Sequence, residues 1–279
     1  MSKYWSLLAN QKSISFIFKI DTTLTSSSTS ANNQYFLPLG GGTYDFVIKW
    51  GDGTEDRITS NLQTERLHTY PEPGEYLITM TGVISNITHN TGESLDNVKI
   101  KQVYNFGTAT TNGYMFYSCL NADFSEVSDM PLIGTATISY ILYGVNGIIK
   151  NIDKWDTSAA QSTNGSFVGS NFNQDITNWD VTNVVDMNYM FYYAYSFNQD
   201  ISKWNFNKEV YFGPSFLAGA GSFSTDNYDK FLIKLASIDW TGRVAAKELG
   251  SSSKYSSAAV AARAALVADG WSITDEGMV

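Results

Sequence analysis

Phe172-Asn-Gln-Asp-Ile-Thr-Asn-Trp-Asp180 is followed 25 residues later by a near copy, Phe197-Asn-Gln-Asp-Ile-Ser-Lys-Trp-Asn205. Self-similarity with a period of about 20 to 30 residues indicates a unit that cannot bury its apolar face alone and must stack on copies of itself. The sequence therefore predicts a solenoid, in which neighbouring repeats build one extended surface.

Two columns of large apolar residues carry this repeat along much of the chain. In both columns the spacings are 26, 25, 24 and 25 residues, which predicts about five 25-residue coils over residues 97–222. Rings that recur at a fixed register usually fill a core, so we expect both columns to be buried. The first column holds Tyr104, Met130, Trp155, Trp179 and Trp204, and the second holds Phe116, Leu142, Phe167, Phe191 and Phe216.

The best-preserved repeats resemble a known family. Phe172-Asn-Gln-Asp-Ile-Thr-Asn-Trp-Asp-Val-Thr-Asn-Val-Val-Asp-Met-Asn-Tyr-Met-Phe191, continued by Ser196-Phe-Asn-Gln-Asp-Ile-Ser-Lys-Trp204, is similar to the BspA-like surface-protein repeats of the leucine-rich class. The resemblance runs from about residue 97 to residue 279. It implies a leucine-rich-type solenoid whose tail is the usual terminator of the family.

Residues 223–279 are predicted to form a helical C-terminal cap. A solenoid needs such a cap because an open end exposes apolar side chains and unpaired strand edges. One helix is indicated by apolar residues at i, i+3, i+4 and i+7, with Thr225 and Asp226 as candidate N-caps. A second helix is indicated over residues 258–268, ending at Gly270 in the left-handed conformation. The apolar residues of the first helix are Tyr228, Phe231, Leu232 and Leu235.

The first hundred residues are expected to form strands. Residues 16–20, 44–50 and 75–80 are rich in aromatic and β-branched residues and are bounded by Gly and Pro clusters. With Trp50-Gly-Asp-Gly-Thr54, His68-Thr-Tyr70 and Pro73-Gly-Glu-Tyr76, this part resembles the polycystic-kidney-disease-type module over about residues 12–85. The resemblance implies an immunoglobulin-like β-sandwich that acts as a spacer or adhesive unit. We assign residues 12–96 to it and residues 1–11 to an N-terminal arm, so the fold class predicted for the chain is mainly β.

Charge and composition narrow the range of partners. The formal net charge of −9 and the lack of a Lys/Arg cluster argue against a nucleic-acid partner, whose phosphates require a basic surface. No stretch approaches the roughly 20 apolar residues of a membrane span, so membrane insertion is not expected. Cys119 is the only cysteine, which excludes an intramolecular disulfide, and we expect it to be a small buried side chain.

The sequence offers no arrangement typical of an enzyme. His68 and His89 are the only histidines, and neither forms a recognisable Ser/His/Asp or Cys/His pattern. Asp52, Glu55 and Asp56 could bind Ca²⁺, but their spacing differs from that of an EF-hand loop, so a solvated hairpin is favoured. We therefore expect a non-enzymatic protein with no metal and no cofactor.

Asp175 and Asp200 occupy the same position in adjacent repeats. Strands lie about 4.8 Å apart, and a retaining glycosidase uses two carboxyl groups about 5 to 5.5 Å apart. However, any solenoid produces this spacing, and Asn151 holds the same position one coil earlier. Since Asp and Asn both hydrogen-bond their own backbone in turns, we favour a structural role. For Asn173 with Asn198 and Gln174 with Gln199, a hydrogen-bonded ladder is favoured over a sugar-binding strip.

Tyr193 and Tyr195 are the candidate binding residues. Tyr193 stands in a column that otherwise holds Ser118, Gly144, Gly169 and Ala218, and Tyr195 stands in the column of Leu120, Asn146, Asn171 and Ala220. A tyrosine in a small-residue column must either point outward or fill a specific gap. Tyrosine supplies flat amphipathic contact area at low entropic cost, which suits a glycan or a protein partner.

These observations favour a structural or binding protein. Lys3 is followed by only a short apolar run before Asn10, which is not the pattern of a secretory signal. We therefore expect a phage virion component, a tail, fibre or head-decoration protein whose partners are other virion proteins and a host-surface glycan or protein. The alternatives are a bacterial cell-surface adhesin and, third, a polysaccharide-degrading tailspike. A homo-oligomer is compatible with the sequence.

Overall fold

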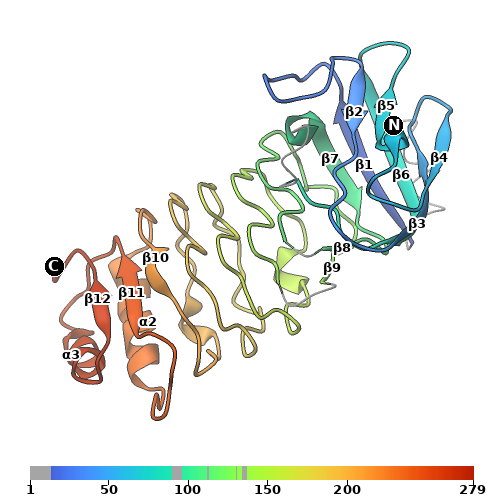
Figure 1. Cartoon of the computed structure of the whole chain (residues 1–279). Coiled ribbons are helices and arrows are strands. Elements are labelled where there is room, and N and C mark those ends of the chain that lie inside the picture. Colours follow the sequence, from blue (N-terminus) through green and yellow to red (C-terminus); the bar gives the residue numbers. More distant parts are fainter. Residues whose placement is uncertain (1–13, 90–95, 112, 130, 134–136) are drawn as a thin grey trace. The chain divides into compact units, whose positions relative to one another are not determined.

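The computed structural model describes residues 14–89, 96–111, 113–129, 131–133 and 137–279 (Figure 1). The chain forms two compact units, one of residues 1–134 with 147–151 and one of residues 135–146 with 152–279. Strands outnumber helices throughout the described part, so the mainly-β fold class is confirmed. The predicted arm at residues 1–11 and the column residue Met130 lie outside the described residues.

The first unit is built on a five-stranded antiparallel sheet with the strand order β4-β3-β6-β1-β7. Two of the three predicted strands are β1 and β3, and the third, predicted at residues 75–80, continues to residue 84 as β6. The Gly-Asp-Gly turn joins β3 to β4, as predicted. The strands of this sheet are β1 (Ser15–Asp21), β3 (Tyr44–Lys49), β4 (Glu55–Ile58), β6 (Glu75–Ile84) and β7 (Ile100–Asn105).

Side-chain alternation explains how this sheet buries one face. In β3, Tyr44, Phe46 and Ile48 are buried while the residues between them are exposed, which is the pattern of a sheet with one solvated side. β2 (Gln34–Phe36) and β5 (Leu67–Thr69) form a separate antiparallel pair. The ring of Tyr35 in β2 lies 6.1 Å from that of Phe18 in β1, so this pair contributes to the same core. A short 3-10 helix, η1 (Thr64–Arg66), precedes β5.

β7 belongs to the sheet and to the first repeat at the same time. It pairs with β1 on one side, while Gln102 forms a parallel bridge with Asp123 on the other. Phe124 forms the next parallel bridge, with Ile149, and β8 (Thr110–Thr111) runs parallel to β9 (Leu132–Ile133). Within the first unit, the sheet therefore continues directly into the stacked segments with no linker between them.

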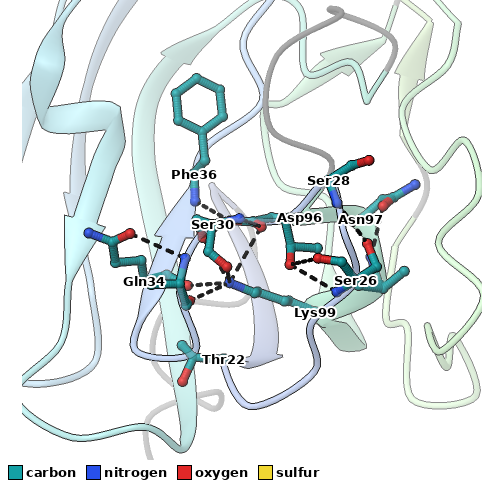
Figure 2. Close-up of polar contacts among 12 residues, drawn as sticks. Thr22, Ser26, Ser28, Ser30, Gln34, Phe36, Asp96, Asn97 and Lys99 are labelled. Atoms are coloured by element: carbon teal, nitrogen blue, oxygen red, sulfur yellow. Dashed lines mark hydrogen bonds and ion pairs between the residues drawn. The ribbon is translucent and has the colours of Figure 1, made fainter.

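A buried ion pair between Asp96 and Lys99 connects the loop before β2 to the segment before β7 (Figure 2). Lys99, at the end of the 3-10 helix η2 (Asp96–Lys99), has no exposed side-chain surface and lies 3.4 Å from Oδ1 of Asp96. Its Nζ lies 2.7 to 3.1 Å from four oxygen atoms of Ser30, Ala31 and Gln34. The Asp96 carboxylate accepts hydrogen bonds from the backbone N–H and hydroxyl of Ser30 and from the N–H of Phe36. Both charges are thus compensated, as burial requires.

The second unit contains successive turns of chain, drawn from yellow to orange in Figure 1, that bond to one another in parallel. Thr137, Ser162, Asp186 and Tyr211 form a continuous row of parallel bridges. The two short 3-10 helices η3 (Ile152–Lys154) and η4 (Ile201–Lys203) lie in equivalent parts of the repeat.

The aromatic columns form the core, as predicted for their described members, except that Tyr104 was wrongly expected to be buried. Phe116, Leu142, Phe167, Phe191 and Phe216 are all buried, as are the three tryptophans of the first column, whereas Tyr104 is half-buried. The rings of Phe167 and Phe191 are parallel with centroids 5.7 Å apart. The indole N–H of Trp179 donates to the Ile152 carbonyl at 2.8 Å, and that of Trp204 donates to the Ile176 carbonyl at 3.0 Å. Each indole therefore ties one repeat to the preceding one.

The C-terminal tail contains the two predicted helices and also two strands that the sequence interpretation missed. α2 spans Thr225–Ala236 and α3 spans Val260–Ala268. β10 (Gly213–Leu217), β11 (Glu248–Ser251) and β12 (Ser272–Thr274) form a parallel sheet, so the cap extends the β-structure of the last repeat.

The predicted N-caps of α2 were wrong. The cap is Ser224, whose hydroxyl accepts from the N–H of Asn227 at 3.3 Å, while Thr225 and Asp226 already lie inside the helix. The predicted end of the second helix is confirmed, because Gly270 has φ of +90° directly after α3.

Candidate binding surface

Four tyrosines of one repeat form a connected, solvent-facing cluster, called here the tyrosine face. Its members are Tyr189, Tyr192, Tyr193 and Tyr195. Ring centroids are 5.4 Å apart between Tyr189 and Tyr192, 4.4 Å between Tyr192 and Tyr193, and 5.7 Å between Tyr193 and Tyr195. Tyr189, Tyr193 and Tyr195 expose 37%, 43% and 55% of their surface. Both residues predicted to bind a partner therefore point outward and lie next to each other.

The backbone of two of these tyrosines is left-handed. Tyr193 has φ of +53°, and Ser118, Gly144 and Gly169 in the same column have φ of +56°, +71° and +64°. The glycines of this column are explained by the left-handed turn, because glycine adopts that region freely, whereas Ala218 is not left-handed. Tyr189 has φ of +59°. A left-handed conformation costs an L-residue about 1 to 2 kcal/mol, and other coils adopt it at the equivalent positions as well.

A glycine in the next repeat makes room for the Tyr193 ring. A Cβ added at Gly219 would lie 2.6 Å from Cδ1 of Tyr193, so any side chain there would displace the ring. The Tyr140 ring lies over Gly165 in the same manner. The ring of Tyr193 is therefore held in a defined position, although almost half of the residue is exposed.

The hydroxyl groups of Tyr192 and Tyr193 in the tyrosine face are hydrogen-bonded to each other. A hydrogen bond with Tyr193 raises the pKa of Tyr192, and burial and the neighbouring tyrosines raise this pKa further. Beside the face, Tyr211 donates to Glu248 at 2.9 Å, and this bond is the main cause of the raised pKa of Tyr211. Asp186 accepts from the side chain of Asn164 and from the N–H of Asn188, both at 3.0 Å. The acidic groups flanking the face are thus already hydrogen-bonded within the protein.

Asp175 and Asp200 form turns, as the favoured interpretation predicted. Oδ1 of Asp175 accepts from the N–H of Thr177 at 2.9 Å and from its hydroxyl at 2.7 Å. Oδ1 of Asp200 accepts the same two bonds from Ser202, at 3.1 and 2.5 Å. The bonds from Thr177 lower the pKa of Asp175. A general acid needs a raised pKa, so Asp175 is poorly suited to that role.

The asparagine ladder is confirmed. Oδ1 of Asn173 accepts from the N–H of Asn198 at 2.8 Å, and Oδ1 of Asn198 accepts from the N–H of Ser224 at 2.9 Å. Gln199 donates its side-chain amide to the carbonyl of Asn173 at 2.8 Å. These amides connect repeats to one another and to the helical tail, so they stabilise the array.

The histidines and Cys119 have structural surroundings. His68 stacks on Trp50 with a centroid separation of 4.6 Å and hydrogen-bonds Asp52 at 2.8 Å. His89 is buried and bonds the Met115 carbonyl through Nδ1; burial lowers its pKa to about 4. Cys119 is buried, as expected, and burial raises the pKa of its thiol.

The acidic turn after β3 is internally bonded. Asp52 accepts from Thr54 as well as from His68, and Asp56 accepts from the indole of Trp50 at 2.7 Å. Over the described ranges, no group of three or more His, Cys, Asp or Glu side chains could hold a metal ion. Neither helix in the part of the chain that the structure describes is long and apolar enough to cross a membrane.

Sequence reasoning missed Tyr189 and Tyr192 as members of the tyrosine face. Tyr189 follows Tyr114, Tyr140 and Gly165 in one column, and these four residues are left-handed, with φ between +54° and +64°. The alignment of Gly165 with these tyrosines was the sequence signal that could have identified the left-handed position of Tyr189. Tyr192 carried no such signal, because its contribution depends on the ring positions of its neighbours.

Comparison with known proteins gives one partial match. Residues 110–231 match a family described as "Mycoplasma protein of unknown function, DUF285", which spans less than half of the chain. No curated protein and no solved structure matches the chain.

Proposed function

We propose that this chain is a non-enzymatic binding protein in which a leucine-rich-type solenoid presents the tyrosine face to a partner, while an immunoglobulin-like sandwich serves as its base. The observation that carries the proposal is the exposure of Tyr189, Tyr193 and Tyr195, whose rings are connected to one another through Tyr192. Tyrosine is typical of binding surfaces because it offers a large contact area with few rotatable bonds. The stacked aromatic core beneath keeps this surface rigid, which lowers the entropic cost of binding.

We further propose that the protein acts on a phage particle and recognises the host surface. A second setting is the surface of a bacterial cell. A polysaccharide-degrading tailspike has less support, because Asp175 and Asp200 are both committed to their own turns.

Cell binding tests the role of the tyrosine face. Fluorescently labelled wild-type protein is titrated onto bacterial cells of the source culture and compared with a variant carrying Tyr189→Ser, Tyr193→Ser and Tyr195→Ser. We expect a loss of at least about 30-fold in affinity, since even one aromatic hot spot among the three contributes about 2 kcal/mol. Val244→Ser is the matched control, because Val244 is 90% exposed in the same unit but outside the tyrosine face. Equal binding by wild type and the triple variant would refute the proposal.

Mass spectrometry of purified phage particles and of bacterial cell fractions tests whether the protein belongs to the virion or to the cell surface. Recovery of the chain in stoichiometric amounts from particles is the expected result. Recovery from the bacterial envelope alone would replace the virion setting by the cell surface and would leave the role of the tyrosine face intact.

A further inference from the structure

Among the described residues, the rings of the tyrosine face have no cation stacked on them, and the acidic groups beside the face are hydrogen-bonded within the protein. In the described part of the chain, no arginine or lysine lies over these rings; the cation–π contacts involve other aromatics. The groups that raise the pKa of the Tyr192 hydroxyl, besides burial, are all tyrosines. The flanking Asp186 has both carboxylate oxygens hydrogen-bonded internally. Neither a cation nor a carboxylate is among the groups that shift the pKa of Tyr192, so an ionic ligand would find no counter-charge at this hydroxyl.

Small residues on both sides leave space beside the Tyr193 ring. The N–H of Tyr193 donates to the Ala218 carbonyl at 3.0 Å, and the Tyr192 carbonyl accepts from the N–H of Gly169 at 2.9 Å. Tyr193 therefore stands between these two neighbouring repeats. Its ring leans over Gly219, while Gly169 on the other side is exposed and has no atom within 4 Å of an added Cβ. The result is a row of mutually tilted tyrosine rings beside the exposed backbone of Gly169.

We infer that the tyrosine face binds an uncharged oligosaccharide, with one sugar ring against Tyr193 and Tyr195 and the next sugar over Gly169. This inference rests on the proposed function and names its ligand. The apolar C–H face of a neutral sugar matches an aromatic ring, while its hydroxyls need the polar groups that tyrosine hydroxyls and the exposed Asn171 supply. An apolar peptide would instead require a hydrophobic pocket for its anchor side chains, and Gly169, Asn171 and Gly219 provide none.

The test is a glycan microarray probed with the purified full-length chain, followed by titration calorimetry on the bound glycans. The array carries neutral oligosaccharides of hexose and N-acetylhexosamine units beside sialylated and sulfated ones. We expect binding to neutral oligosaccharides only. Tyr195→Ser should weaken that binding by at least about tenfold, whereas Tyr195→Phe, which keeps the ring, should change it by less than about threefold. Tyr195 is 55% exposed, so neither change endangers folding.

Gly219→Ala moves the Tyr193 ring without removing it. We expect this variant to weaken glycan binding by about fivefold, because ring position decides the stacking contact. Gly277→Ala is the matched control: Gly277 has φ of +81°, close to the +77° of Gly219, but an added Cβ meets no atom within 4 Å. Backbone strain is thus similar in both variants, and only one displaces a tyrosine.

The possible outcomes separate this inference from the proposed function. Binding only to anionic glycans, binding to no glycan, or neutral-glycan binding unaffected by Tyr195→Ser would each overturn the inference. If cell binding still depended on the tyrosines in such a case, the proposed function would stand with a protein or a charged glycan as the partner. If cell binding did not depend on them, both would fail.

Discussion

Replacing Lys99 by methionine should destabilise the first unit strongly. Methionine keeps most of the apolar stem but removes every donor from a site where Nζ lies within 3.1 Å of four oxygen atoms. Asp96, whose side chain is only 1% exposed, would keep its hydrogen bonds from Ser30 and Phe36 but would lose the ammonium charge of Lys99. Breaking a buried pair from one side typically costs about 3 to 5 kcal/mol. We expect a loss in that range for Lys99→Met.

Hydrogen exchange read by mass spectrometry in increasing urea measures this loss on the peptides of β1, which lie in the same unit. Arg57→Met is the matched control. Arg57 binds Asp45 through two hydrogen bonds of 2.9 and 3.1 Å, but the two side chains are 67% and 54% exposed. An exposed pair contributes about 1 kcal/mol or less. If the two variants lost equal stability, the argument that burial makes the Asp96–Lys99 pair important would be refuted.

Three further perturbations test the titration of His89, the packing of the Phe191 column and the turn at Asp180. Burial lowers the pKa of His89 from 6.5 to about 4, so between these pH values the unfolded state binds more protons than the folded state. The free energy of unfolding should therefore have its full value above pH 6.5 and fall by up to about 3 kcal/mol toward pH 4. The stability of His89→Gln, measured by denaturation curves across this pH range, should depend on pH much less than that of wild type. An unchanged dependence would contradict the assignment of this effect to His89. Phe191→Ala should lower the unfolding free energy of the second unit by about 3 to 5 kcal/mol in urea titrations followed by tryptophan fluorescence, and a loss below about 1 kcal/mol would mean that the column is not a packed core. Thr182→Val removes the hydroxyl that lowers the pKa of Asp180, so NMR titration should show that pKa moving up toward 3.8 while Asp175 is unchanged; a shift in both or neither would contradict the local-turn explanation.

Repetition made the core predictable before the structure was known. The column containing Phe167, Phe191 and Phe216 is buried because a stacked array imposes one environment on equivalent residues. The strands of the first unit were readable for a different reason: alternating apolar residues between Gly and Pro clusters specify a half-buried strand. Both signals are local or periodic, so a single sequence contains them.

Features that depend on contacts distant in sequence were not readable. β11 and β12 are short and form strands because β10 offers an edge for parallel pairing. The burial of Lys99 depends on backbone carbonyls some 65 to 69 residues earlier, which no local pattern reveals.

The candidate binding residues show the same limit. Tyr193 was identifiable because it breaks a column of small residues. The left-handed backbone that explains the column, and the position of its ring over Gly219, required the structure.

Hydroxyl-radical footprinting tests most directly whether the tyrosine face is the contact surface. The full chain is oxidised free in solution and while bound to bacterial cells of the source culture, and the modification of each tyrosine is read by mass spectrometry. We predict that Tyr193 and Tyr195 become protected on binding, while Leu62, which is 82% exposed in the first unit, is oxidised equally in both states. Protection elsewhere with unchanged oxidation of Tyr193 and Tyr195 would contradict the central claim.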